Sequence, residues 1–358
     1  MSEAVRSALA TIVEGGSLSR EDARAAMGAV MDGEATPAQL AALLMGLRMR
    51  GETVEELAGF ASAMRERVLR VDAPEGTVDV VGTGGDGSNT FNISTASALV
   101  VASIGVPVAK HGNRAITSKS GSADVLDALG IRIDHTAESA AAALRELGFA
   151  FMFAINFHPA MKHAGPTRRE IGVRTAFNLL GPLTNPAGAR RALLGVGDAA
   201  VAGKIAAVAA LLGTDRTMVV HGAGVDELPL DGSAEVHDVV GSRIESASVD
   251  VEGLGLRRAP MSALAGGTAE ENAAIIESIF AGDAGPRRDV ILLNAGAALV
   301  VAGAADGFAE GVEAARAAID AGRPSDLLAR LRAERRAADG EAARAAAAGR
   351  AAAAGATP

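Results

Sequence analysis

The sequence predicts an α/β protein, with a small all-helical N-terminal domain and a large α/β domain whose central, mostly parallel sheet is flanked by helices. Three observations predict this fold. Helix start signals recur through the first seventy residues, and strand and helix patterns alternate from Thr77 onward. In addition, 49% of the 358 residues are hydrophobic, which is enough to bury one large core and a smaller one.

The N-terminal region carries three pairs of residues with the spacing of a helix capping box. They are Ser19 with Asp22, Thr36 with Gln39, and Thr53 with Glu56. Pro37 stands at the first helical position after Thr36, where proline is favoured. Leucines then recur at helical spacing from Leu40 to Leu47. We therefore assign residues 1–71 to a helical domain.

From Thr77 the pattern changes to short apolar strands that alternate with helices. Strands are expected at 78–81, 106–109, 192–196, 217–220 and 235–239, and helices at 95–104, 123–129, 199–212, 290–301 and 307–321, with a further helix starting at Thr268. Such alternation is typical of a parallel sheet covered on both faces. Residues 72–335 are therefore assigned to the α/β domain.

The last segment, 336–358, is rich in Ala, Arg and Gly and has almost no large apolar side chain. It offers little to a core, so we expect a helix that frays into a disordered tail.

The composition of the chain argues against several classes of function. The formal net charge is −9 and the chain has no Trp or Tyr, so neither general attraction to nucleic acid nor base stacking on aromatic side chains is supported. There is no cysteine, which excludes disulfides, thiolate metal sites and a cysteine nucleophile. No secretory signal and no apolar stretch of about 20 residues is present. The expected protein is cytoplasmic and binds neither membrane nor nucleic acid.

A glycine cluster follows the first expected strand. Its residues, Gly82-Thr83-Gly84-Gly85-Asp86-Gly87, satisfy the pattern of a dinucleotide-binding loop. That interpretation also requires a helix that opens at the glycines and an acid about 20 residues later. Here a polar stretch intervenes, and no acid occurs between Asp86 and Asp124. The pattern alone is therefore weak evidence for a dinucleotide.

The same segment suits a phosphate group. It combines unobstructed backbone amides with Asn92-Ile93-Ser94-Thr95 at an expected helix start, although an ordinary glycine turn with a capping residue would look similar. The next strand leads into Lys110-His111-Gly112-Asn113-Arg114 and the hydroxyls of Ser118 and Ser122. Two parallel strands thus lead into polar loops at one sheet edge, where α/β proteins bind ligands.

In order and spacing, these segments resemble the anthranilate phosphoribosyltransferase family. The resemblance includes Gly121-Ser122-Ala123-Asp124 and a later run from Pro166 to Pro186, and it extends from about residue 5 to 335. It implies a fold shared with pyrimidine nucleoside phosphorylases, in which residues 167–190 return to the helical domain. It also implies a homodimer formed through the helical domains.

The resemblance further implies the reaction, in which the amine of anthranilate displaces pyrophosphate from C1 of 5-phosphoribosyl 1-pyrophosphate (PRPP), the second step of tryptophan biosynthesis from chorismate. The residues implied for PRPP are Gly82, Gly85, Asp86, Thr90, Asn92, Ile93, Ser94, Thr95, Lys110, His111, Gly112, Asn113, Arg114, Ser118 and Ser122. Those implied for anthranilate are Gly82, Asn113 and Arg168, and those for Mg²⁺ are Ser94, Asp226 and Glu227.

No general base is expected, because a neutral aryl amine attacks without prior deprotonation; positioning by Asn113, Arg168 and Lys110 is expected instead. Two alternatives stay open at this point. One is a nucleoside phosphorylase of the same fold, which needs no acidic metal pair such as Asp226 and Glu227. The other is a relative that binds nucleic acid and is not an enzyme, which should be strongly basic. A lone Asp-Glu pair is also compatible with a solvated turn.

Overall fold

A computed structural model of the chain describes residues 2–115 and 119–355, apart from the side chains of 345–355. Four helices form the N-terminal part: α1 (Glu3–Val13), α2 (Arg20–Met31), α3 (Pro37–Arg50) and α4 (Val54–Glu66). Thr36 and Thr53 make complete capping boxes, and the Ser19 hydroxyl accepts from the Asp22 amide. The helix starts that the sequence predicts here are confirmed.

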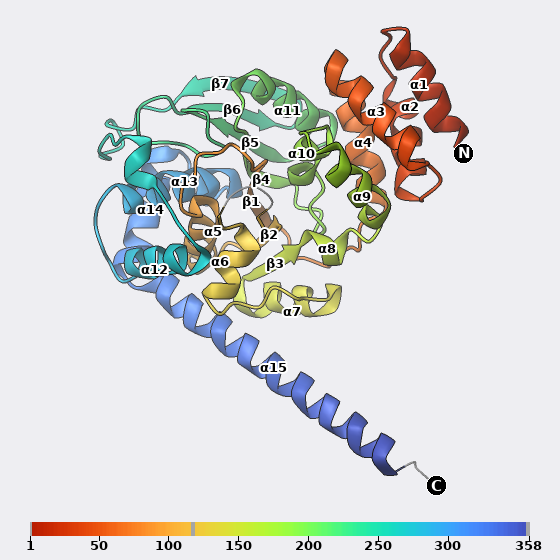
Figure 1. Ribbon diagram of the computed structural model, residues 1–358. Coiled ribbons are helices and arrows are strands. Elements are labelled where there is room, and N and C mark those ends of the chain that lie inside the picture. The colour runs from red at the N-terminus through yellow and green to blue at the C-terminus, as the bar shows by residue number, and fades with distance from the viewer. Residues whose placement is uncertain (1, 116–118, 356–358) are drawn as a thin grey trace.

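A seven-stranded sheet forms the centre of the larger part (Figure 1). Its strands are β1 (Val78–Gly82), β2 (Val108–Gly112), β3 (Phe149–Phe153), β4 (Arg191–Gly195), β5 (Arg216–His221), β6 (Glu235–Val240) and β7 (Arg243–Ser248), in the order β3-β2-β1-β4-β5-β6-β7. The first five are parallel, and β6 and β7 are antiparallel. The mostly parallel sheet is therefore confirmed.

The remaining helices cover the sheet and link its strands. They are α5 (Ile93–Ser103), α6 (Ser122–Ala128), α7 (Ala137–Leu147), α8 (Ala154–Phe157), α9 (Met161–Ile171), α10 (Phe177–Leu180), the 3₁₀ turns η1 (Gly181–Leu183) and η2 (Met261–Leu264), α11 (Ala199–Leu211), α12 (Ala269–Phe280), α13 (Pro286–Ala302), α14 (Phe308–Asp320) and α15 (Arg323–Gly355).

The two faces of the sheet bury different apolar clusters. Val80 and Leu193 pack with residues of α5 and α13 on one face. Val81 and Leu194 pack on the other face with α11, the N-terminal helices and residues of α9 and α10. The segment from α9 to α10 thus lies against the N-terminal helices, with α9 in contact with α2 and α3.

One strand differs from its sequence prediction. The strand expected at 106–109 runs instead from Val108 to Gly112, so Lys110 and His111 belong to β2 and are buried. Polar side chains in the middle of the run made the strand look shorter than it is. The prediction that Lys110 and His111 lie in a loop is therefore wrong.

The helix expected within 336–358 is present as the end of α15, which projects from the body of the protein and continues to Gly355 (Figure 1). Alanine has the highest helix propensity of the residues, so a helix can continue where no core supports it. The fraying expected at its end stays a prediction.

No helix in the described ranges is long and apolar enough to cross a membrane.

Candidate active site

The glycine loop and the loop after β2 lie at one edge of the sheet, because β1 and β2 are parallel neighbours and their carboxyl ends point the same way. Gly84 and Gly85 have φ of +65° and +66°. Consecutive left-handed residues expose backbone groups on one side of a loop, and glycine adopts them without steric cost.

The loop after β5 brings two carboxylates to this edge. Asp226 accepts a hydrogen bond from the Gly84 amide at 2.7 Å, and Glu227 accepts one from the Ser94 amide at 2.9 Å. A Cβ on Gly82 would lie 2.2 Å from Oδ2 of Asp226. Glycine at position 82 is therefore required for the close approach of Asp226.

Burial and mutual repulsion shift the pKa values of this acidic pair. The pKa of Asp226 is raised to about 6 by burial and by the neighbouring carboxylate of Asp86. Burial and Asp226 likewise raise the pKa of Glu227 well above its usual value. The charge of Asp86 also raises the pKa of Glu227, and Oδ2 of Asp86 accepts a hydrogen bond from the Asp226 amide at 3.4 Å.

Lys110 is the nearby cation, and it is only 1% exposed. Its Nζ donates to the Val80 carbonyl at 2.6 Å and to Oγ of Ser94 at 3.3 Å. Burial lowers the Lys110 pKa, and the acids Asp79, Glu227 and Asp226 oppose that shift. Lys110 is therefore a buried counter-ion to these three carboxylates.

When ionised together, Asp86, Asp226 and Glu227 would carry more negative charge than Lys110 balances. A divalent cation would relieve this repulsion, and magnesium commonly takes one or two carboxylates while substrate phosphates and water complete its shell. Within the described part of the chain, no group of three or more His, Cys, Asp or Glu side chains forms a ready metal cage. The donor set fits a magnesium ion shared with a phosphate ligand.

The N-terminus of α5 carries Asn92, Ile93, Ser94 and Thr95. Asn92 precedes the helix, and its side chain bonds to Ser120 and Asn272. Ile93 is 1% exposed and packs in the core, so only its backbone is left to face a ligand. Ser94 is half-buried beside Lys110 and Glu227, whereas Thr95 is fully buried.

Asp86 and Thr90 are joined through Ser88 in the glycine loop. Oδ1 of Asp86 accepts from both the amide and the hydroxyl of Ser88 at 3.0 Å, and the Ser88 hydroxyl lies 3.3 Å from that of Thr90. Thr90 also forms an isolated bridge with Ala265. Both residues thus shape the loop that follows Gly85.

The loop after β2 holds Asn113 and Arg114 at the surface. The Ser122 hydroxyl donates to the Asn113 carbonyl at 3.2 Å, and Arg114 is paired with Asp124 at 2.7 Å. Asp124 also accepts from the amides of Ala115 and Gly121, so it closes this loop. Ser118 lies outside the described residues.

His111 joins a buried polar network beneath the site. Its Nε2 lies 3.2 Å from Nε2 of His158, and its amide donates to Asp79 at 3.1 Å. Burial lowers the pKa of His111 to about 3, with His158 contributing, and burial raises that of Asp79 to about 6. A neutral, enclosed His111 positions the strand and offers no exposed charge to a phosphate.

Arg168, on α9, lies 4.8 Å from the ring centroid of Phe177, over its face. Burial lowers its pKa, and no carboxylate pairs with it among the residues that the structure describes. A half-buried guanidinium without an acidic partner suits a carboxylate ligand, which it can hold through two parallel hydrogen bonds.

Sequence reasoning assigned no role to three residues that support the site, although two of them, Arg174 and Asn185, lie within the run from Pro166 to Pro186. Arg174 donates from Nη1 to the carbonyls of Gly84 and Gly85, at 2.7 and 2.8 Å. Asn272 donates to Asn92 at 2.9 Å, and Asn185 donates to Asp79 at 2.7 Å. Single polar residues carry no periodicity, so nothing in the sequence indicates partners so far along the chain.

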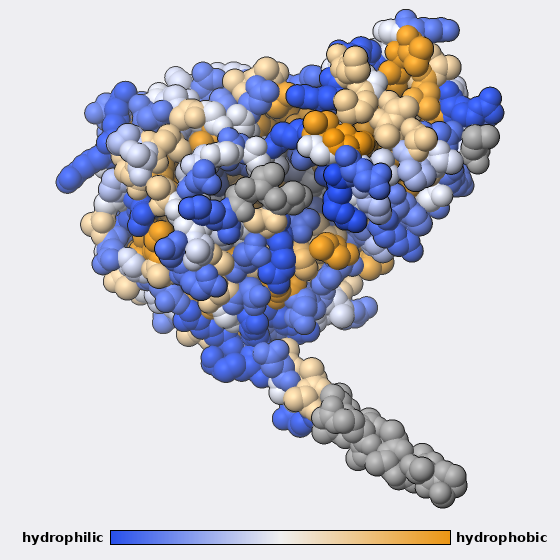
Figure 2. Space-filling view, in the orientation of Figure 1, coloured by the Kyte–Doolittle hydropathy of each residue, from blue (hydrophilic) through white to orange (hydrophobic). Residues whose placement is uncertain are grey.

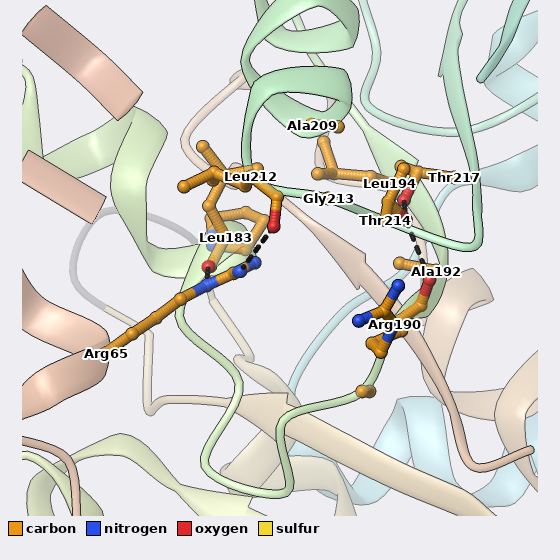
Figure 3. A pocket seen from close by; sticks show the side chains of 12 residues that line it. Arg65, Leu183, Arg190, Ala192, Leu194, Ala209, Leu212, Gly213, Thr214 and Thr217 are labelled. Carbon is orange, nitrogen blue, oxygen red and sulfur yellow. Dashed lines mark hydrogen bonds between the residues drawn. The ribbon is translucent and has the colours of Figure 1, made fainter. Parts of the chain in front are cut away.

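A cavity of about 30 Å³ lies apart from these residues, between α4, β4 and α11 (Figure 3). It has room for roughly one water molecule. Arg65 borders it and donates to the carbonyls of Leu183 and Leu212. The cavity is too small for an organic substrate, so it does not compete with the sheet edge as the candidate site.

Comparison with known families agrees with the fold. Residues 74–324 match the glycosyl transferase family, a/b domain, and residues 6–68 match the glycosyl transferase family, helical bundle domain. The chain is 49% identical over 330 residues to the anthranilate phosphoribosyltransferase of Azorhizobium caulinodans, covering 92% of this chain and 96% of that protein.

Two solved structures extend the comparison. The anthranilate phosphoribosyltransferase of Thermus thermophilus has a TM-score of 0.88 and 45% identity, with 94% of this chain and 100% of that chain covered. The Saccharomyces cerevisiae anthranilate phosphoribosyltransferase in complex with PRPP and Mg has a TM-score of 0.85 and 27% identity, with 94% and 99% covered.

Proposed function

This chain belongs to the anthranilate phosphoribosyltransferase family, the glycosyltransferases that join anthranilate to PRPP in the second step of tryptophan biosynthesis, and we propose that the sheet edge described above carries out that reaction. The observation that carries the assignment is the acidic pair Asp226 and Glu227, held by the amides of Gly84 and Ser94. A nucleoside phosphorylase would not need this pair.

PRPP occupies the glycine loop, the N-terminus of α5 and the loop after β2 in this proposal. The backbone amides of the glycine loop and of the N-terminus of α5, other than those of Gly84 and Ser94, face the phosphates, with the side chains of Ser94, Asn113 and Ser122 beside them. Asp226 and Glu227, with Ser94, would hold a magnesium ion, which would supply positive charge to the departing diphosphate. A yeast relative of the same fold binds both PRPP and Mg, which supports this arrangement.

Anthranilate is placed by Arg168, Asn113 and the backbone at Gly82. Arg168 binds the carboxylate, so that the amine faces C1 of the ribose. The amine is neutral and attacks directly, while the bond from C1 to the diphosphate oxygen breaks and the configuration at C1 inverts. The proton then passes from the product nitrogen to water, and no side chain has to act as a strong base.

The direct test is a fluorescence assay, in which anthranilate emission falls when the protein is mixed with anthranilate, PRPP and magnesium. The chain has no Trp or Tyr, so its own emission interferes little. Replacement of Asp226 and Glu227 by Ala together should remove most activity while leaving the fold intact, and excess magnesium should restore little.

Replacement of the exposed acids Asp250 and Glu252 by Ala is the matched control, because it removes the same charge elsewhere. Normal turnover by the Asp226 and Glu227 double variant would show that magnesium is held by other residues. Absence of any turnover by the unmodified chain would contradict the proposed function itself.

We also propose a cytoplasmic homodimer joined through the helical domain. Val13 on α1 and Met49 on α3 are each 84% exposed, and apolar surface gathers over α1 (Figure 2). Contiguous exposed apolar side chains are typical of protein interfaces. Light scattering coupled to gel filtration should give twice the mass of one chain, and a Val13→Asp, Met49→Asp variant should give the mass of one chain.

A further inference from the structure

Arg174 joins two parts of the molecule that are far apart in sequence. It follows α9, which ends at the left-handed Gly172 and packs against α2 and α3. Its side chain crosses to the glycine loop, where Nη1 donates to the carbonyl of Gly84 at 2.7 Å and to that of Gly85 at 2.8 Å. One nitrogen therefore ties the α9 segment to the loop after β1.

Gly84 is held from two directions. Its amide donates to Asp226 at 2.7 Å, and its carbonyl accepts from Arg174. Glycine has the largest conformational freedom in the unfolded and mobile states, so a loop of glycines keeps one shape only when other groups fix it. The two contacts together fix the left-handed conformation in which Gly84 and Gly85 are found.

Arg174, unlike several other arginines of the protein, has no carboxylate partner among the residues that the structure describes. Arg20, Arg24 and Arg67 each pair with carboxylates. Arg174 is exposed, and nothing within the described ranges accepts a hydrogen bond from its Nε or Nη2 or forms an ion pair with it. Among the described residues, the hydrogen bonds of Arg174 therefore go to the glycine loop and neutralise no carboxylate.

We propose that Arg174 is a positioning residue that holds the glycine loop in the shape that receives the diphosphate of PRPP. The proposal rests on the proposed function, since it assigns the loop to PRPP. Arg168 stands six residues earlier on the same segment, so the segment that places anthranilate also fixes the PRPP loop.

Three variants test this role. Arg174→Ala removes both contacts and should raise the KM for PRPP about tenfold, the loss expected for charge-assisted hydrogen bonds at an exposed site, with a smaller change in kcat and in the KM for anthranilate. Arg174→Lys should stay within about threefold of the unmodified chain, because both contacts come from one nitrogen and an ammonium can make both. Arg169→Ala removes a neighbouring exposed charge and should change neither KM.

Each variant is also titrated with PRPP in a calorimeter, in the presence of magnesium and the absence of anthranilate. The affinities for PRPP should rank the variants in the same order as the KM values for PRPP. Gly84→Ala provides a second route, because its φ is left-handed and no atom lies within 4 Å of the added Cβ; it should weaken PRPP binding without any loss of charge. Unchanged PRPP affinity in Arg174→Ala would overturn the proposal.

An Arg174→Lys variant as weak as Arg174→Ala would also overturn it, since the guanidinium would then be needed for the ligand itself. These outcomes are read against an active unmodified chain, whereas failure of the proposed function would appear as inactivity of that chain.

Discussion

At the scale of a single residue, a change at Arg168 should affect the use of anthranilate and not that of PRPP. It is half-buried over Phe177, without a carboxylate partner among the described residues. If it holds the anthranilate carboxylate, Arg168→Ala should raise the KM for anthranilate about tenfold to a hundredfold, since a charge-assisted hydrogen bond contributes about 1.5–3 kcal/mol. The KM for PRPP should change little.

Steady-state kinetics with each substrate varied in turn provides the measurement, with Arg169→Ala as the control. Equal changes in both KM values, or no change in either, would remove Arg168 from the anthranilate site.

The raised pKa of Asp79 predicts that the free energy of unfolding depends on pH. Its pKa is raised to about 6 in the folded protein, so it stabilises the fold below its ordinary pKa of about 4 and this contribution is lost as the pH rises through 6. The loss is at most about 3 kcal/mol, because a tenfold change in an acid dissociation constant corresponds to about 1.4 kcal/mol. His111 and His158 have lowered pKa values and act in the opposite direction, losing their contribution as the pH falls.

Comparison of the unmodified chain with Asp79→Asn isolates the Asp79 contribution. Urea unfolding at pH 5, 6 and 7.5 should show that the advantage of the unmodified chain over the variant shrinks as the pH rises. A constant difference across these pH values would mean that Asp79 keeps an ordinary pKa.

At the level of elements, local sequence signals correctly predicted the helix starts, which depend on interactions between residues close in sequence. Thr36, Thr53 and Thr268 cap helices as their spacing indicates. The strands β3 and β7 escaped prediction for different reasons. Phe149–Phe153 is a short apolar run that does not distinguish a strand from a buried helix, and every residue of Arg243–Ser248 is exposed, so no alternation marks it.

In the candidate site, too, some residues could be predicted from local sequence and others could not. Glycines and hydroxyls after β1 and β2 could be recognised because parallel strands bring their ends together. Lys110 was expected in the loop after the strand, but β2 extends through it and buries it beside Ser94. The contact of Arg174 with Gly84 depends on how α9 packs, which no local pattern encodes.

The end of α15 should be dispensable. Among the described side chains, Leu327, Leu328 and Leu331 are its last buried apolar ones, and Arg335 makes its last contacts with the body of the protein. A chain that ends at Ala337 should keep its melting temperature within about 1 °C and its turnover, because an isolated helix adds no packing.

A chain that ends at Ser325 is the contrasting variant. It loses three buried leucines, each contributing about 1.5–3 kcal/mol, and should be strongly destabilised. A large loss of melting temperature in the chain that ends at Ala337 would show that the projecting part of α15 docks on the protein or on a second copy.

At the level of the whole molecule, the helical and α/β parts share one core. Leu44 and Phe60 of the N-terminal helices belong to the same buried cluster as Leu194 and Val219 of the sheet. Polar contacts cross the same boundary: Lys204 donates to the Glu52 carbonyl at 2.6 Å, and Arg65 reaches the carbonyls of Leu183 and Leu212 (Figure 3). A division at residue 71 stays a prediction about domains, and this shared core makes an independent fold for either part unfavourable.

We therefore expect one cooperative thermal transition in scanning calorimetry, with equal calorimetric and van't Hoff enthalpies for the dissociated chain, because neither part can lose its structure without exposing the apolar face of the other. A chain that starts at Asp72 should fail to fold as a stable monomer, since α11 and the outer face of β4 and β5 would lose their cover. The chain that ends at Ala337 controls for truncation itself. Two resolved transitions, or a folded monomer of residues 72–358, would mean that the boundary cluster contributes little and that the two parts are energetically separate.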